Sequence, residues 1–413
     1  MNWFEPNVDC FWFHKKRHES TNYNCSCVSV FVSINLHLVL TLVPRHFQYL
    51  FLVLILSVNL HAQEVEGARR PWSYSLSPHY GFIVPHTKQM EHLIQGHSYG
   101  GHVYLYRKTY GNTFWQQAYN YPEQGLDLTF INTGNANQLG QQYVAGFLLN
   151  LPLNKGKNEA LKSKRSYAHW LGLALGAGYT TRTWDLESNH QAAVIGSRSN
   201  ISLGLQYSLR VARFGQAELR AGIRITHFSN GAFQLPNLGT NNAGVFLSYM
   251  HHSEKKSIEE KQPVPVYKKN TTSISSAIGL KEIPPPYGRK FLTSVTSFLQ
   301  ERRISYKSSF GLGMDVMYNS SLKVLMERKR EERIPSKEVL QLGAVFSYSL
   351  HFNQFELKMQ QGVYLRDNWK VDGLFYHRFG LRYHFTKHVF AQLTLKTHFA
   401  KADFGEWGLG YSF

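Results

Sequence analysis

A histidine and a serine stand two residues apart at the end of an alternating stretch, AELRAGIRITHFSN, residues 217–230. Residues i and i+2 of a β-strand lie on one face, so the spacing predicts that the imidazole of His227 and the hydroxyl of Ser229 are neighbours. Serine alone is a weak nucleophile, but an adjacent imidazole can take its proton and later return it to the leaving group. That chemistry cleaves acyl esters. The pair also fits two interfacial residues that hydrogen-bond water or lipid head groups, and both interpretations stay open at this point.

The strand that carries the pair has one apolar and one polar face. The residues that share a face with the pair are Ala217, Leu219, Ala221, Ile223 and Ile225, and the opposite face carries Glu218, Arg220 and Arg224. If the apolar face meets lipid, the pair faces lipid too. A tilted strand advances roughly 2.3 Å per residue along the membrane normal, which puts His227 roughly 28 Å from the short turn at 213–215. Because an apolar band is about 25 Å tall and periplasmic turns are short, the pair is predicted at the opposite, external interface.

The same alternation recurs along the chain from Trp72 onward. Further examples lie at 171–179, 201–211, 355–366 and 389–399. Such segments, with short turns at one end and longer loops at the other, indicate an outer-membrane β-barrel, although a soluble β-sandwich also alternates. We predict an all-β fold, a transmembrane antiparallel outer-membrane β-barrel of about 12–16 strands. A single closed barrel is favoured because one closing segment is visible, the amphipathic ending EWGLGYSF with its terminal Phe413.

The first 62 residues are predicted to be a cleaved leader. Arg45 and His46 precede the apolar run YLFLVLILSV, residues 49–58, and the small Ala62 follows, which is typical of a secretory signal peptide cut after Ala62. All three cysteines lie in this leader, so the mature chain would hold no disulfide, thiol nucleophile or cysteine-based zinc site. These features favour the barrel over the sandwich. They predict the outer membrane of a Gram-negative bacterium as the location, with the barrel assembly machinery as a partner.

The net charge and the remaining motifs limit the possible partners and cofactors. The formal net charge of +18 suggests a polyanionic partner, and nucleic acid, an anionic membrane surface and a phosphorylated lipid all fit. The 20 histidines show no convincing metal spacing, and no nucleotide-binding glycine-rich loop or HExxH motif occurs, so no metal or cofactor is predicted. A charged, proline-containing linker at 253–270 separates residues 63–252, which carry the pair, from additional strands over 271–413 with the closing signal.

The surroundings of the pair extend the motif. The run His227-Phe228-Ser229-Asn230-Gly231 continues through Pro236, Asn237 and Gly239 to Asn241. It resembles the lipid A 3-O-deacylase (PagL-type, acyloxyacyl hydrolase-like) family of outer-membrane esterases, closely over about 25 residues and more loosely across 72–252. The resemblance implies that Ser229 is the nucleophile and His227 the general base, and that Asn230 and Gly231 support the oxyanion or the turn. It also implies the ester-linked acyl chain at the 3-position of lipid A, within lipopolysaccharide, as the substrate, with no cofactor.

The sequence departs from that family at Asn241, where the family places a glutamate that orients the histidine. Asparagine can accept a hydrogen bond from the imidazole but supplies no negative charge. In a serine protease the comparable change lowered turnover about 10⁴-fold through the wrong histidine tautomer. We therefore carry two hypotheses: an esterase acting on lipid A, with Asn241 as the third member of its site, and a non-enzymatic porin, transporter or structural barrel, in which the extra strands widen the lumen. A soluble basic lectin or nucleic-acid-binding protein fits the alternating strands and the leader less well.

Overall fold

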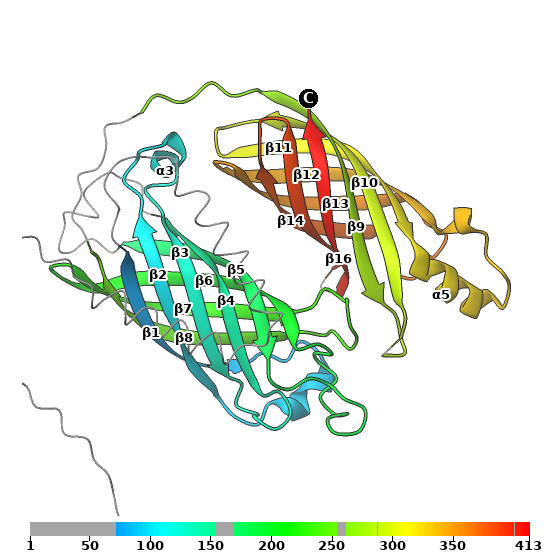
Figure 1. The fold of residues 1–413 in the computed structure, drawn as a ribbon, viewed down its shortest axis with the longest axis horizontal. Coiled ribbons are helices and arrows are strands. Elements are labelled where there is room, and N and C mark those ends of the chain that lie inside the picture. Colours follow the sequence, from blue (N-terminus) through cyan, green and yellow to red (C-terminus); the bar gives the residue numbers. More distant parts are fainter. Residues whose placement is uncertain (1–71, 154–167, 254–261, 287, 400) are drawn as a thin grey trace, which may run out of the picture. The chain divides into compact units, whose positions relative to one another are not determined.

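The computed structural model describes residues 72–153, 168–253, 262–286, 288–399 and 401–413. Within them, sixteen strands close into two antiparallel barrels of eight, in which β8 pairs back with β1 and β16 pairs back with β9 (Figure 1). The predicted leader, its cleavage point and the cysteines lie outside the described residues. No helix of the described residues is long and apolar enough to cross a membrane.

The strands of the first barrel are β1 (Ser73–Ile83), β2 (Ser98–Lys108), β3 (Glu123–Asn132), β4 (Gln141–Pro152), β5 (His169–Thr180), β6 (Ser199–Phe214), β7 (Ala217–Ser229) and β8 (Thr240–His251). A 3₁₀-helix η1 (Lys88–Leu93) follows β1, and a short helix α3 (Phe114–Ala118) follows β2.

The strands of the second barrel are β9 (Asn270–Glu282), β10 (Lys290–Arg303), β11 (Ser308–Asn319), β12 (Leu340–Phe352), β13 (Phe355–Arg366), β14 (Phe375–His384), β15 (Val389–His398) and β16 (Lys401–Ser412). Helices α5 (Ser320–Arg330) and η2 (Ser336–Val339) lie between β11 and β12.

The strand number agrees with the prediction, but the prediction of one closed barrel is wrong. The amphipathic ending is needed for only one of the two closures, that of β16 on β9, where Tyr411 pairs with Ile274. The first barrel closes through β8, whose Phe246 pairs with His79 of β1. Barrel closure depends on pairing between strands far apart in the sequence. The period-two pattern of a strand does not indicate which distant strand it pairs with. The interpretation that extra strands widen one lumen therefore falls as well, because an eight-stranded barrel is just wide enough for its side chains to fill.

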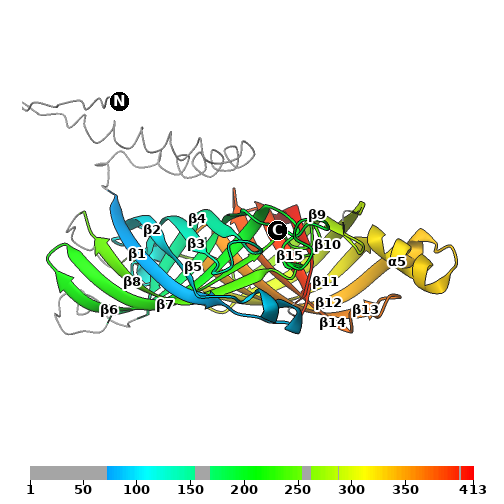
Figure 2. The ribbon, with the colours of Figure 1, turned by 90° about the horizontal axis from the view of Figure 1, so that it is seen from below.

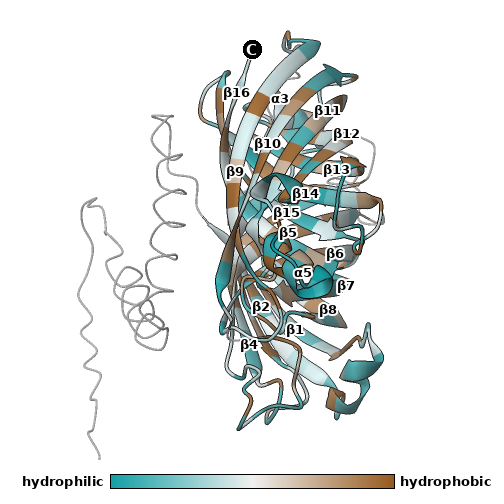
Figure 3. Cartoon of the chain, turned by 90° about the vertical axis from the view of Figure 1, so that its right-hand side faces the viewer, coloured by the Kyte–Doolittle hydropathy of each residue, from teal (hydrophilic) through white to brown (hydrophobic). Residues whose placement is uncertain are grey.

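Each barrel has an apolar exterior and a polar interior. On β7, Ile223 is 57% exposed, whereas Arg220 and Arg224 are each 2% exposed, which confirms the outward orientation predicted for the apolar face. Apolar and polar residues interchange along strands such as β10 and β11 of the second barrel (Figure 3). This pattern is that of outer-membrane barrels, whose lipid-facing and lumen-facing side chains alternate.

The connections only partly follow the predicted division into short and long ends. In the second barrel, the turns after β10, β12 and β14 are short and lie at one end. In the first barrel, the two-residue turn between β6 and β7 shares its end with long connections after β2 and β4. The expected pattern, with short turns at one end and long loops at the other, therefore does not hold for the first barrel.

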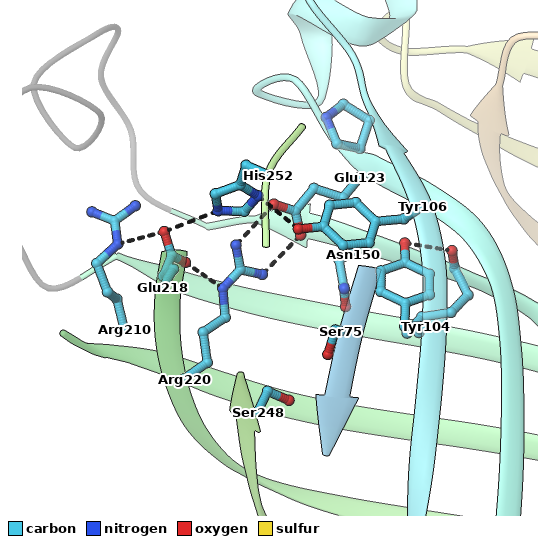
Figure 4. Close-up of polar contacts among 12 residues, drawn as sticks. Ser75, Tyr104, Tyr106, Glu123, Asn150, Arg210, Glu218, Arg220, Ser248 and His252 are labelled. Carbon is cyan, nitrogen blue, oxygen red and sulfur yellow. Dashed lines mark hydrogen bonds and ion pairs between the residues drawn. The ribbon is translucent and has the colours of Figure 1, made fainter. Parts of the chain in front are cut away.

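Buried ion pairs lie inside the first barrel (Figure 4). Arg220 donates to both carboxylate oxygens of Glu123 at 2.8 Å and also bonds Glu218. Glu218 forms a further ion pair with Arg210, whose Nε lies 3.0 Å from the carboxylate. The Arg220 guanidinium lies 3.4 Å from the ring centroid of Trp170. In such a cluster each charged side chain needs a partner of opposite charge, because an unpaired buried charge costs several kcal/mol.

Replacing Arg220 with leucine is expected to destabilise the first barrel by about 3–5 kcal/mol, because Glu123 would remain buried without its cation. Urea unfolding of the refolded protein in lipid vesicles measures the change. The exposed Lys88 in η1 serves as control, since surface substitutions stay within about 0.5 kcal/mol. Equal unfolding midpoints for Arg220→Leu and Lys88→Leu would contradict this account of the lumen.

Candidate active site

Strand β7 presents His227 and Ser229 on its outer face at the end remote from the β6–β7 turn. Their neighbours across the sheet are outward residues too, since Leu203 pairs with His227 and Ile201 with Ser229. Between them Phe228 points inward and is fully buried. It belongs to an apolar cluster that also contains Ile83, Met90, Leu93, Ile131, Leu139, Val144, Ala192, Val194 and Ile195. The apolar anchor on one face of the strand thus fixes the two polar side chains on the other, in the wall formed by β6, β7, β8 and β1 (Figure 2).

The loop between β7 and β8, residues 230–239, is held by the loop between β5 and β6. Gly196 donates its backbone N–H to Pro236 O at 2.7 Å, and Leu238 donates to Val194 O at 2.9 Å. Ile195 and Asn237 form an isolated β-bridge. The loop that covers Ser229 is therefore tied on both sides, and Ser229 is only 8% exposed.

Two hydrogen-bond donors converge on the Ser229 hydroxyl. The backbone N–H of Gly231 lies 3.2 Å from Ser229 Oγ, and Asn237 Nδ2 lies 3.5 Å from it. Asn237 is itself oriented, because its Oδ1 accepts the backbone N–H of Asn230 at 2.9 Å. Donors of this kind, fixed before a reaction begins, stabilise negative charge that develops beside a nucleophile.

Asn230 is engaged in the loop. Its side-chain Nδ2 donates to Ser197 Oγ at 2.8 Å and to Gln234 O at 2.9 Å, and its Oδ1 accepts from Gln234 N at 3.3 Å. The side chain thus braces the loop, whereas the side chain of Asn237 reaches the serine. The sequence places Asn237 in the motif but assigns no role to it. Its contact depends on the folded loop, and only the Pro-Asn-x-Gly turn signalled it.

His227 and Asn241 are direct cross-strand partners on β7 and β8. His227 Nδ1 lies 2.7 Å from Asn241 Oδ1, and because a carbonyl oxygen only accepts, Nδ1 carries the proton. The other nitrogen, Nε2, then has a free lone pair and is able to act as a base. On its far side the Asn241 amide contacts His86, with Asn241 Nδ2 at 3.2 Å from His86 Nδ1.

His227 and Ser229 are close but not hydrogen-bonded to each other in the structure. Gly239 lies against both, since a Cβ built on it would stand 2.9 Å from His227 Cε1 and 3.4 Å from Ser229 Cβ. Its φ of +77° and its contact with Phe228 O require glycine there. Catalytic hydrogen bonds are often long in unliganded enzymes and shorten when substrate binds. Among the described residues, no group of three or more histidine, cysteine, aspartate or glutamate side chains is arranged to hold a metal ion.

Comparison with known families gives two matches. Residues 99–250 match the model described as lipid A 3-O-deacylase (PagL), and residues 270–413 match the acyloxyacyl hydrolase C-terminal domain. The chain belongs to the lipid A 3-O-deacylase family. That family is one of carboxylic ester hydrolases, which favours the esterase hypothesis over the non-enzymatic barrel. The second match covers strands that the sequence resemblance had left unassigned.

Other comparisons add little. No curated protein matches the chain. Among solved structures, two variants of the Rhodopseudomonas blastica porin are 8% and 9% identical, and each match covers 84% of this chain and 100% of the porin with a TM-score of 0.16. At that TM-score the porins inform neither the fold nor the function of this chain.

Proposed function

We propose that this protein is an outer-membrane serine esterase that removes the ester-linked acyl chain at the 3-position of lipid A. The observation that carries the proposal is the convergence at Ser229: two fixed donors reach its hydroxyl, and a histidine with a free Nε2 stands on the same strand face. The family membership supplies the substrate class. The outward orientation of the site suits a substrate whose acyl chains lie in the bilayer beside the barrel.

The proposed reaction has two steps. Ser229 Oγ attacks the ester carbonyl while His227 Nε2 takes the hydroxyl proton, and Gly231 N–H with Asn237 Nδ2 stabilises the oxyanion. His227 then gives the proton to the departing sugar oxygen, which leaves an acyl chain on Ser229. Water, deprotonated by the same imidazole, attacks that acyl ester. The bond to Ser229 Oγ breaks, His227 returns the proton to this oxygen, and the fatty acid is released. Apart from water, both steps use only groups of the site, with Asn241 as acceptor for His227 Nδ1–H and Asn230 as the residue that shapes the loop.

The location and the partners follow from the same proposal. A barrel with an apolar exterior that acts on lipid A resides in the outer membrane, with the site at the external rim where acyl chains meet sugar. Positive charge would help to hold the lipid A phosphates. Assembly by the barrel assembly machinery remains a prediction from the terminal Phe413.

Purified, refolded protein in detergent micelles with lipopolysaccharide provides the test. The proposal expects time-dependent release of free fatty acid, proportional to the amount of folded barrel. A folded protein that releases none, and instead conducts ions through planar bilayers, would support the non-enzymatic hypothesis.

The substitution Asn237→Asp isolates the proposed oxyanion donor. Aspartate keeps the oxygen that accepts from Asn230 N–H but replaces the amide donor with an anion. We expect kcat to fall about 10²- to 10³-fold with KM little changed, measured by initial rates of fatty-acid release. An unchanged kcat in a folded variant would assign oxyanion stabilisation to other groups.

A further inference from the structure

A second histidine, His86, stands behind Asn241 in the connection after β1. Its Nδ1 lies 3.2 Å from Asn241 Nδ2, and its Nε2 lies 3.1 Å from Leu238 O. The segment is anchored on both sides of His86, because Val84 N–H donates to Asn241 O at 2.8 Å and Met90 is fully buried in the apolar cluster. His86 therefore bridges the β7–β8 loop and the side chain that contacts the proposed base.

The donors and acceptors along this chain of contacts permit one arrangement when His86 is neutral. Leu238 O only accepts, so His86 Nε2 carries the proton and Nδ1 is an acceptor. An acceptor at Nδ1 requires the amide nitrogen of Asn241 to face it, which turns Oδ1 toward His227. His227 must then hold its proton on Nδ1, and its Nε2 faces away from Asn241 with a free lone pair.

We infer that His86 is a positioning residue that fixes the amide orientation of Asn241 and, through it, the catalytically competent tautomer of His227. The inference rests on the proposed function and deepens it. A glutamate has two equivalent oxygens and presents an acceptor in either orientation. An asparagine presents an acceptor in one orientation and a donor in the other, and the donor selects the wrong tautomer, which in a serine protease cost about 10⁴-fold in turnover. A chain with asparagine at this position therefore needs a second group to choose the orientation.

The first test compares three variants in fatty-acid release from lipopolysaccharide. His86→Phe keeps a ring of similar size but makes neither bond, and we expect kcat to fall roughly three- to tenfold with KM unchanged, since one hydrogen bond sets about a factor of ten at most. His86→Gln supplies a carbonyl for Asn241 Nδ2 and an amide for Leu238 O, and should restore the rate. His92→Phe is the matched control, because His92 also bonds a loop carbonyl, Gln191 O at 3.2 Å, without touching Asn241.

The second test repeats His86→Phe in the Asn241→Glu background. A carboxylate needs no help to present an acceptor, so the substitution should change kcat less than twofold there. Equal losses in both backgrounds, or a loss in His92→Phe as large as in His86→Phe, would assign His86 a merely structural role and overturn the inference.

The third test reads the tautomer without turnover. Two-bond ¹H–¹⁵N correlation spectra of histidine-labelled protein, with His227 assigned by its loss in His227→Gln, should show Nδ1–H in the wild type and in His86→Gln. They should show Nε2–H gaining population in His86→Phe. The proposed function fails if folded wild type releases no fatty acid, whereas this inference fails if the His227 tautomer is the same in wild type and His86→Phe.

Discussion

Replacing Ser229 with alanine is expected to lower fatty-acid release from lipopolysaccharide about 10⁴-fold or more. The substitution removes the oxygen that would form the acyl-enzyme and on which the two donors converge. Loss of the nucleophile in a serine hydrolase costs up to about 10⁶-fold in kcat. Initial rates measured at equal amounts of folded protein provide the comparison, with folding judged by heat-dependent migration on gels.

The control for this prediction is Ser199→Ala. Ser199 is the first residue of β6 and is exposed, so its loss should leave the rate unchanged. If Ser229→Ala released fatty acid at the wild-type rate, Ser229 would not be the nucleophile. His227 and Ser229 would then be interfacial residues that hydrogen-bond water or lipid head groups.

Replacing His227 with glutamine is expected to lower the rate on the order of 10⁴-fold, because general-base catalysis contributes up to about that factor. Glutamine is polar and of similar length but takes no proton at neutral pH. Residues that act as a unit are not additive in their effects, so the double variant with Ser229→Ala should be no slower than Ser229→Ala alone.

His169→Gln offers the matched control, since His169 begins β5 at the opposite end of the same barrel and contacts Tyr207 Oη at 2.7 Å. A double variant slower than Ser229→Ala by the full factor of His227→Gln would show that the two residues act independently. That result would contradict a shared proton transfer.

The sequence predicted the features that follow from a period of two. The faces of β7, and with them the outward orientation of the pair, depend only on alternation, and Ile223 and Arg220 show it in their exposure. The candidate partner Asn241 came from the family resemblance, and the structure pairs it with His227 across the β7–β8 hairpin. Closure into two barrels did not follow, since it depends on pairing between β1 and β8 that local alternation leaves open.

The loop contacts were equally inaccessible from sequence. Asn237 reaches Ser229 because the β7–β8 loop is tied to Val194 and Gly196, which lie far away along the chain. His86 reaches Asn241 across 155 positions, and its position in a polar connection gives no periodic signal. Side chains on loops acquire their partners only when the strands that carry those loops are in register.

Mass spectrometry of lipid A tests the central claim most directly, in cells that assemble either the wild-type protein or Ser229→Ala at equal levels. The account predicts that wild-type cells lose the mass of one ester-linked acyl chain, that the loss maps to the 3-position, and that Ser229→Ala cells keep it. Identical lipid A from both strains, with both barrels assembled in the outer membrane, would contradict the account.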